Sequence, residues 1–249
     1  MRRYRQRSTK NIIDELKEIQ AQGYQLVQFS DDCFPTNLLQ AHALFDAIIH
    51  EQLNLTFMIA ASRVDLAEEE LYKKMRQAGV THIQFGLESG NQDVLDFYQK
   101  QTKVETIKKA VYLSHENGFF TIGSFILGAP FETTNHFSRT LKFAQSLPLD
   151  SVSFLPLRYM IGSPLWHQAV DEGKISKDEY LVLADKHRGL GMYTTEEIFR
   201  YCLHAQRSFY GRPSFAMNLL KKSLRNNDMT YVQSYLSILF SSIKRFFVH

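Results

Sequence analysis

The chain has 249 residues and 44% of them are apolar, which is enough for one large α/β domain with a helical extension but not for three separate domains. Its 29 basic and 26 acidic residues leave a net charge of +3, too small to indicate a nucleic-acid partner. Cys33 and Cys202 are the only cysteines, so neither a disulfide framework nor a multi-cysteine metal site is predicted within one subunit, and a cytoplasmic location is favoured.

Short β-rich runs alternate with amphipathic helical stretches along the first two thirds of the chain. The first helix is predicted over 11–22, where Ile12, Leu16 and Ile19 recur at helical spacing after the possible caps Ser8 and Thr9. Strands are then predicted over 24–30, 55–62, 81–88, 119–128 and 151–159, with helices between them over 38–52, 67–78, 92–99, 104–117 and 133–146.

The spacing of the strands predicts how they are connected. Successive runs begin roughly 26 to 38 residues apart, the length of a strand plus a returning helix, so parallel βαβ units are favoured over hairpins. The spacing fits both an open doubly wound sheet and a partial barrel. The longest apolar stretch, 119–131, is interrupted by glycine and proline and is too short for a membrane span. After Gly162 only helices are predicted, over 176–186, 195–210, 214–225 and 230–247.

Polar residues follow the predicted strands, at the edge where parallel α/β folds bind ligands. Asp31 and Asp32 follow the first run, where Asp32 could equally cap a helix. Arg63 follows the second, and its planar fork suits a carboxylate or phosphate, or else a salt bridge to Asp65 or Glu68. These residues are candidates for binding a ligand.

Glu88 gives the sharpest local signal, because it leaves an apolar strand between two glycines. A buried carboxylate needs hydrogen-bond donors, and a pair of sugar hydroxyls would serve as well as Ser89 or a backbone amide. The fourth run ends in glycines up to Gly128, which permit close approach to a flat ligand or a tight turn. The nine histidines show no metal-ligand spacing, so no metal is assigned to them.

The order of these motifs carries a family resemblance. The resemblance is carried by the succession of FSDDCF, SRVD, GLESGNQDVLDFYQKQT, GFFTIGSFILGAPFET, FLPLRYMIGSPLW and the tail TTEEIFRYCLHAQRSFYGRP. In this succession the chain resembles the radical S-adenosylmethionine superfamily, in its cobalamin-binding-domain branch with the elongator and magnesium-protoporphyrin cyclase-like enzymes. The resemblance implies an α/β fold, a partial (β/α)6 TIM-like barrel that lacks its first strand. Strands two to six would lie in residues 1–165, followed by a helical C-terminal extension over 166–249.

The resemblance also implies roles for the strand-end residues. Asp31 and Asp32 would face the methionyl ammonium of S-adenosylmethionine, Arg63 its carboxylate, and Glu88 with Ser89 the ribose hydroxyls. The turn containing Gly128 and Pro130 and the backbone around Leu155 and Leu157 would frame the adenine.

Cofactors and partners follow from the same resemblance. The family binds a 4Fe-4S cluster through a CxxxCxxC loop that this sequence lacks, so the cluster is expected only with an upstream cysteine loop. In the full-length family, cobalamin and a cobalamin-binding domain, upstream or on a separate chain, would accompany a small-molecule substrate, with no nucleic acid and no membrane span.

Three functions stay open at this point. The first is a radical S-adenosylmethionine enzyme core or fragment that serves methylation, cyclisation or rearrangement of an unknown small molecule. The second is a truncated, non-catalytic nucleotide-binding or interaction protein. The third is an unrelated α/β enzyme on a barrel scaffold. Without the cysteine motif, enzyme activity is left undecided.

Overall fold

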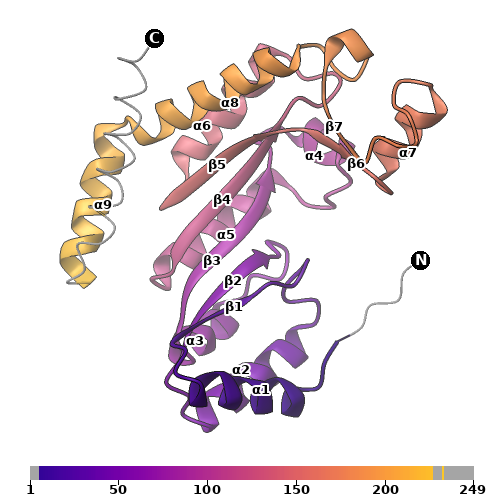
Figure 1. The fold of residues 1–249 in the computed structure, drawn as a ribbon. Coiled ribbons are helices and arrows are strands. Elements are labelled where there is room, and N and C mark those ends of the chain that lie inside the picture. The colour runs from indigo at the N-terminus through magenta and orange to yellow at the C-terminus, as the bar shows by residue number, and fades with distance from the viewer. Residues whose placement is uncertain (1–5, 227–231, 233–249) are drawn as a thin grey trace. The chain divides into compact units, whose positions relative to one another are not determined.

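The structure is a computed structural model that describes residues 6–226 and residue 232. It divides into two compact units with the boundary between Cys202 and Leu203. The first unit begins as an alternation of helices and strands (Figure 1): α1 (Thr9–Ala21), β1 (Leu26–Phe29), α2 (Leu38–His50), β2 (Thr56–Ser62), α3 (Glu69–Gln77), β3 (Val80–Glu88), α4 (Gln92–Phe97), α5 (Val104–Glu116), β4 (Phe120–Leu127), α6 (Thr134–Ser146) and β5 (Ser151–Pro156).

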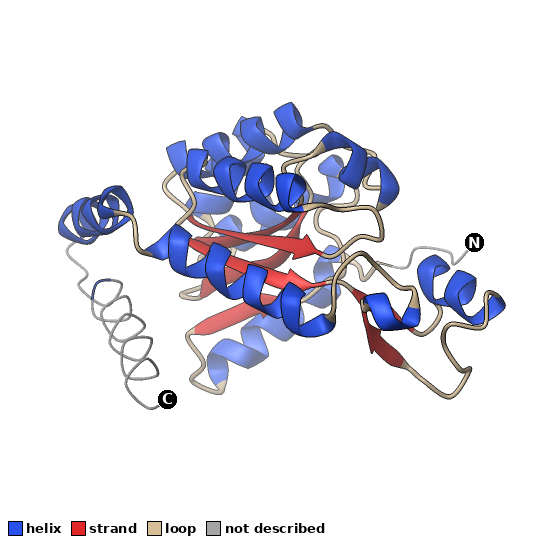
Figure 2. Ribbon diagram, turned by 90° about the horizontal axis from the view of Figure 1, so that it is seen from above, coloured by secondary structure: helices blue, strands red, loops and turns tan. Residues whose placement is uncertain are grey.

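The five strands form one parallel sheet in the order β1-β2-β3-β4-β5. Every connection between neighbours contains a helix, and the spatial order follows the chain without the reversal that defines a doubly wound sheet. The predicted α/β class and partial barrel are therefore confirmed. Strand spacing had also fitted an open doubly wound sheet, which the strand order excludes. Figure 2 shows the strands side by side, flanked by helices.

Alternation of side chains gives the sheet two unlike faces. In β3 and β4 the buried positions include Ile83, Phe85, Leu87, Phe125 and Leu127, each at most 1% exposed. This face packs with the buried sides of the helices, because successive residues of a strand point to opposite faces. The other positions are half-exposed and include Gln84, Ser124 and Ser153. We call this half-exposed side the inner face.

The remainder of the described chain comprises β6 (Arg158–Met160), α7 (Pro164–Asp171), β7 (Leu181–Leu183), the short 3-10 helix η1 (Lys186–Arg188), α8 (Thr195–Tyr210) and α9 (Pro213–Asn226). In the second unit the Arg212 guanidinium lies 4.2 Å from the centre of the Phe209 ring, which also packs against Phe215. No helix within residues 6–226 has the length and apolar character needed to cross a membrane.

β6 and β7 pair antiparallel and form what we call the β6–β7 ribbon. Tyr159 pairs with Val182, both are buried, and the Tyr159 hydroxyl donates to the Leu190 carbonyl at 3.1 Å. The Leu157 N–H donates to the Leu127 carbonyl at 2.8 Å, and the Leu157 carbonyl accepts from Ala184 N–H at 3.1 Å. These two bonds attach the ribbon to the end of β4.

The helix predicted over 176–186 is wrong, because this segment contains β7. The apolar run at 180–184 is too short for its periodicity to separate strand from helix, and pairing with β6 decides the outcome. The run predicted over 151–159 divides at Leu157 into β5 and β6, and α7 was not predicted. The helix predicted over 230–247 lies outside the described residues, apart from residue 232. The boundary predicted after residue 165 stays a prediction.

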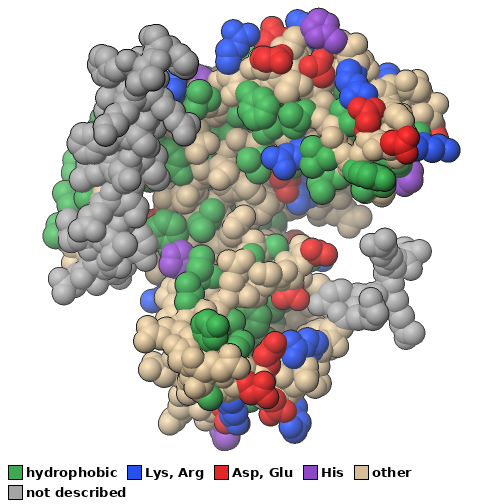
Figure 3. Space-filling view, viewed as in Figure 1, with side chains coloured by type: hydrophobic (Ala, Val, Ile, Leu, Met, Phe, Trp, Pro, Cys, Tyr) green, Lys and Arg blue, Asp and Glu red, His purple; other side chains and the backbone are tan. Residues whose placement is uncertain are grey.

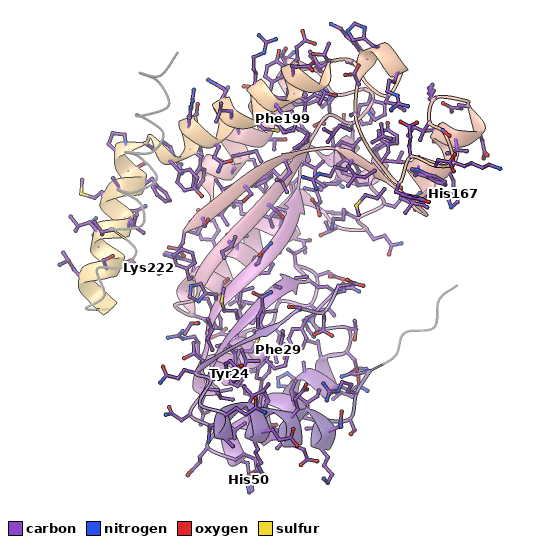
Figure 4. All side chains as sticks on the ribbon, in the orientation of Figure 1. Tyr24, Phe29, His50, His167, Phe199 and Lys222 are labelled. Atoms are coloured by element: carbon purple, nitrogen blue, oxygen red, sulfur yellow. The ribbon has the colours of Figure 1, made fainter. Side chains whose placement is uncertain are left out.

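Phe125 tests the buried face. Its side chain is 0% exposed and its ring stacks on Phe154 with centroids 5.3 Å apart, so F125A should lower the free energy of unfolding by about 3–5 kcal/mol. Urea unfolding followed by circular dichroism measures the change. The control is F199A on α8 (Figure 4), because Phe199 is 49% exposed and its loss should change stability by only about 0.5 kcal/mol. Equal effects of the two substitutions would contradict this assignment of the core.

Candidate functional site

Glu88 ends β3 in a backbone conformation that non-glycine residues rarely adopt. Its φ is +61°, and the register between β3 and β4 shifts between Gly86 and Glu88. A left-handed residue at a β-bulge redirects its side chain and stores strain, which proteins retain mainly at functional positions. A Cβ at Gly86 would lie 2.7 Å from Glu88 Oε1, so a larger residue at this position would displace the carboxylate from its present place.

Lys100 is the partner of Glu88. Its Nζ lies 2.7 Å from Glu88 Oε1, and the side chains are 37% and 13% exposed, respectively. Lys100 lies in the turn after α4, where its N–H donates to the Leu95 carbonyl at 3.1 Å. The site therefore carries both charges at the end of β3. Sequence analysis missed Lys100, because only the turn geometry brings it to Glu88.

Ser89 has a different environment from Glu88. Its side chain is fully buried, and its hydroxyl lies 3.0 Å from Thr140 Oγ1 on α6 while accepting from the Asn91 N–H at 3.2 Å. Asn91 Nδ2 donates in turn to the His136 carbonyl at 2.9 Å. The Ser89 hydroxyl thus braces the end of β3 against α6, and this network gives no support to its predicted contact with a ribose.

The turn after β4 is held by Glu132, which sequence analysis also missed. Glu132 is fully buried, and its Oε2 accepts from the N–H groups of Gly128 at 2.7 Å and Ala129 at 2.8 Å. Gly128 has a φ of +109°, where a side chain would be strained. Burial raises the pKa of Glu132 to about 7, despite the opposing effect of the two backbone donors.

Two buried polar atoms near this turn have no hydrogen-bond partner among the described residues, Glu132 Oε1 and the Tyr98 hydroxyl. Burial raises the pKa of Tyr98, and the charges of Glu132 and Glu88 add to the effect. Buried polar groups are normally satisfied. Their unmet hydrogen-bonding capacity is therefore a property expected of a site that receives a polar ligand or water.

The other residues predicted to frame a base lie close by. Leu155 is exposed and pairs with Ile126 on the inner face. Leu157 is buried, and its backbone is already used by its bonds to Leu127 and Ala184. Pro130 follows Gly128 in the turn that Glu132 holds. Leu155 therefore offers a free apolar surface, whereas the Leu157 backbone has no free N–H.

The loops after β1 and β2 are joined to each other. Phe34 N–H donates to the Ala61 carbonyl and Arg63 N–H to the Phe34 carbonyl, both at 2.7 Å. Asp31 and Asp32 are exposed in the first loop, and Asp31 borders a groove of about 470 Å³ formed with α1 and α2. In the space-filling view, acidic side chains are visible on this part of the molecule (Figure 3).

Arg63 makes the ion pair that sequence analysis left open. Its Nε donates to Asp65 Oδ1 at 3.0 Å and its Nη2 to Asp65 Oδ2 at 2.6 Å, and these bonds raise the pKa of the guanidinium. Glu68 instead lies 3.2 Å from His42 Nε2. A second carboxylate would have to displace Asp65 from the fork, so Arg63 is a weaker candidate for a ligand contact than Lys100.

The cysteines do not form a metal centre. Cys33 is half-buried in the loop after β1, and burial in α8 raises the pKa of the Cys202 thiol to about 12. Among residues 6–226 and 232, no group of three or more His, Cys, Asp or Glu side chains is arranged to hold a metal ion. Iron-sulfur clusters are held mainly by cysteine thiolates, so these residues do not fit one.

Comparisons of the sequence agree on one family. The model of the radical SAM superfamily matches residues 1–144. An uncharacterized methyltransferase, PH0819 of Pyrococcus horikoshii, is 28% identical over 94% of this chain and 53% of its own length. The anaerobic magnesium-protoporphyrin IX monomethyl ester cyclase of Rubrivivax gelatinosus is 31% identical over 58% of this chain and 26% of its own length. The chain thus spans about half the length, or less, of these curated relatives.

A comparison of folds agrees with the sequence. The radical S-adenosylmethionine methyltransferase TsrM from Kitasatospora setae, in a structure with tryptophan and a SAM analogue bound, superposes with a TM-score of 0.61. The match covers 68% of this chain and 34% of TsrM at 21% sequence identity, so it shows the fold alone.

The pKa of Glu132 makes stability depend on pH. Because this pKa rises from 4.5 to about 7 on folding, the protonated carboxyl stabilises the folded state, and this contribution is lost as the pH rises from about 4.5 through about 7. The loss should be on the order of 2–3 kcal/mol. Urea unfolding between pH 5 and 8, in steps, measures it. E132Q keeps an acceptor for the two backbone N–H groups and should remove this component, so an unchanged pH slope in E132Q would contradict the assignment.

Proposed function

The chain belongs to the radical SAM superfamily, and from this membership we propose that its partial barrel binds S-adenosylmethionine at the C-terminal ends of the strands. The observation that carries the proposal is the strained Glu88, held at the end of β3 with its carboxylate against Lys100. Backbone strain and a largely buried carboxylate both cost stability. A ligand that contacts Glu88 explains why both are retained at this position.

Glu88 and Lys100 match two different parts of S-adenosylmethionine. A carboxylate accepts hydrogen bonds from the two adjacent ribose hydroxyls. The Lys100 ammonium is more than one third exposed and pairs with one carboxylate among the described residues, so it would take the methionyl carboxylate. In this proposal Lys100 replaces Arg63 in the role first predicted from the sequence, because the Arg63 fork is occupied by Asp65.

The rest of the ligand is proposed to lie along the neighbouring strand ends. Asp31 and Asp32 remain the candidates for the methionyl ammonium, since both carboxylates are exposed in the loop after β1. The turn at Gly128 and Pro130, together with the Leu155 side chain, would border the adenine. Glu132 would act on the base only indirectly, by fixing the turn through its two backbone hydrogen bonds.

S-adenosylmethionine supplies a transferable methyl group or a deoxyadenosyl group when it is bound. The names of the relatives, a methyltransferase and a cyclase, support methylation or cyclisation of a small molecule as the reaction to which this chain contributes. Cobalamin, a cobalamin-binding domain and a cytoplasmic location stay predictions. A 4Fe-4S cluster would need thiolates from outside this sequence, because Cys33 and Cys202 do not fit one.

Two ligands separate the proposed roles of Glu88 and Lys100. 5′-Methylthioadenosine shares the ribose and base of S-adenosylmethionine but lacks the amino-acid group. E88Q should weaken binding of both ligands about tenfold to a hundredfold, since charge-assisted hydrogen bonds of roughly 1.5–3 kcal/mol are lost. K100Q should weaken only S-adenosylmethionine, by about tenfold. Isothermal titration calorimetry of the full chain measures both affinities.

K109Q is the matched control, because Lys109 is an exposed residue of α5 with no ion pair among the described residues, and it should bind as the unmodified chain does. Equal losses for both ligands in K100Q would remove Lys100 from the carboxylate role. Unchanged affinity in E88Q with a lower melting temperature would make Glu88 a structural brace. If neither ligand binds the unmodified chain at millimolar concentration, the proposal fails.

Iron content tests the cysteines independently. After anaerobic reconstitution with iron and sulfide, the chain should hold no stoichiometric four-iron cluster, because two separated cysteines cannot supply the thiolates that such a cluster needs. Iron analysis and the visible absorbance of the cluster measure this. Four irons per chain with full cluster absorbance would contradict the prediction.

A further inference from the structure

One face of the β6–β7 ribbon exposes two paired apolar side chains, Met160 and Leu181, which we call the apolar strip. Met160 is 55% exposed and pairs with Leu181, which is 50% exposed. The opposite face of the ribbon is buried through Tyr159. Apolar side chains are visible on the surface of the lobe that holds β6 and β7 (Figure 3). Clustered exposed apolar residues are typical of binding surfaces.

A guanidinium lies at the barrel end of this strip. Arg158 is exposed, pairs with Leu183 across the ribbon, and alternates with the buried Tyr159, so it shares the exposed face with Met160. Among residues 6–226 and 232, the Arg158 side chain makes no hydrogen bond and no ion pair. By contrast, the Arg63 guanidinium donates two hydrogen bonds to Asp65, and the Arg188 guanidinium donates two to Glu179.

The position of Arg158 connects the strip to the strand ends. Arg158 directly follows Leu157, whose N–H bonds to the carbonyl of Leu127, the residue before Gly128. Arg158 is therefore one residue away from the backbone hydrogen bond between Leu157 and Leu127 at the end of β4. Its backbone is held on the other side by the buried Tyr159, whose hydroxyl bonds to Leu190. These contacts fix the backbone from which the Arg158 side chain extends.

We propose that the exposed face of the ribbon is a substrate subsite for an apolar molecule that carries an oxyanion group, a carboxylate or a phosphonate. Arg158 binds the oxyanion through its planar fork, and Met160 and Leu181 contact the apolar body. The subsite rests on the proposed function, because it borders the strand ends assigned to S-adenosylmethionine, and it adds the chemical class of the substrate. A guanidinium without an ion-pair partner beside the apolar strip complements a molecule of this class better than it complements a neutral polar molecule.

The test reads out the subsite directly and needs no bound cofactor. The full chain is labelled with 13C at its methionine methyl groups, and M160L assigns the Met160 resonance. The probes are hexylphosphonate, hexanoate and hexan-1-ol, which share one apolar chain and differ in the head group. Hexylphosphonate or hexanoate should shift the Met160 resonance saturably, and comparing the two distinguishes a phosphonate from a carboxylate preference. The resonances of the buried Met75 and of Met217 in the second unit serve as references.

R158Q should weaken the anionic probe that binds better by about threefold to fivefold, the loss expected for one exposed charged contact, and should leave hexan-1-ol unchanged. R139Q, which removes an exposed arginine of α6 with no partner among the described residues, should have no effect. The proposal is overturned if no probe shifts Met160, if Met217 shifts equally, or if R158Q and R139Q behave alike. These results are independent of S-adenosylmethionine titrations, so either proposal can fail alone.

Discussion

The structure depends on the alternation of side chains along its parallel strands, because successive residues point to opposite faces and only one face of the sheet is buried. Because Phe85, Leu87 and Phe125 point to the helices, the half-exposed positions of the inner face need not contribute to the core. The sheet can therefore carry Gln84 and Ser124 on its inner face without loss of stability. Because the strands are parallel, their carboxyl ends lie at one edge of the sheet, where loops with charged residues follow them.

Two carboxylates at this edge have opposite environments and different tasks. Glu88 faces a cation and part of its side chain reaches solvent, so it suits direct contact with a ligand. Glu132 is enclosed and holds two backbone N–H groups, and burial moves its pKa close to neutrality. Burial and partners, rather than residue type, decide which carboxylate is open to a ligand and which one shapes the turn.

Sequence analysis succeeded where the information is local or periodic. Strand and helix periodicity gave the alternation of the barrel, and the motif order gave the family. Lys100 and Glu132 were missed because their contacts depend on the turns after α4 and β4, which no residue spacing reveals. The error at 176–186 has the same origin, since a short apolar run becomes a strand only when β6 supplies its partner. The roles assigned to Asp31, Asp32 and the adenine-framing residues stay predictions.

The attachment of the ribbon through Leu157 has a consequence for how such a protein can diverge. Only the backbone of Leu157 bonds to Leu127 and Ala184, so neither contact specifies a side chain. The exposed positions of the ribbon, including Met160 and Leu181, can therefore be replaced over evolutionary time while the turn at Gly128 keeps its shape. The barrel edge and the ribbon are joined through the backbone but can mutate separately, so a substrate subsite on the ribbon, as proposed above, would change while the barrel stays constant.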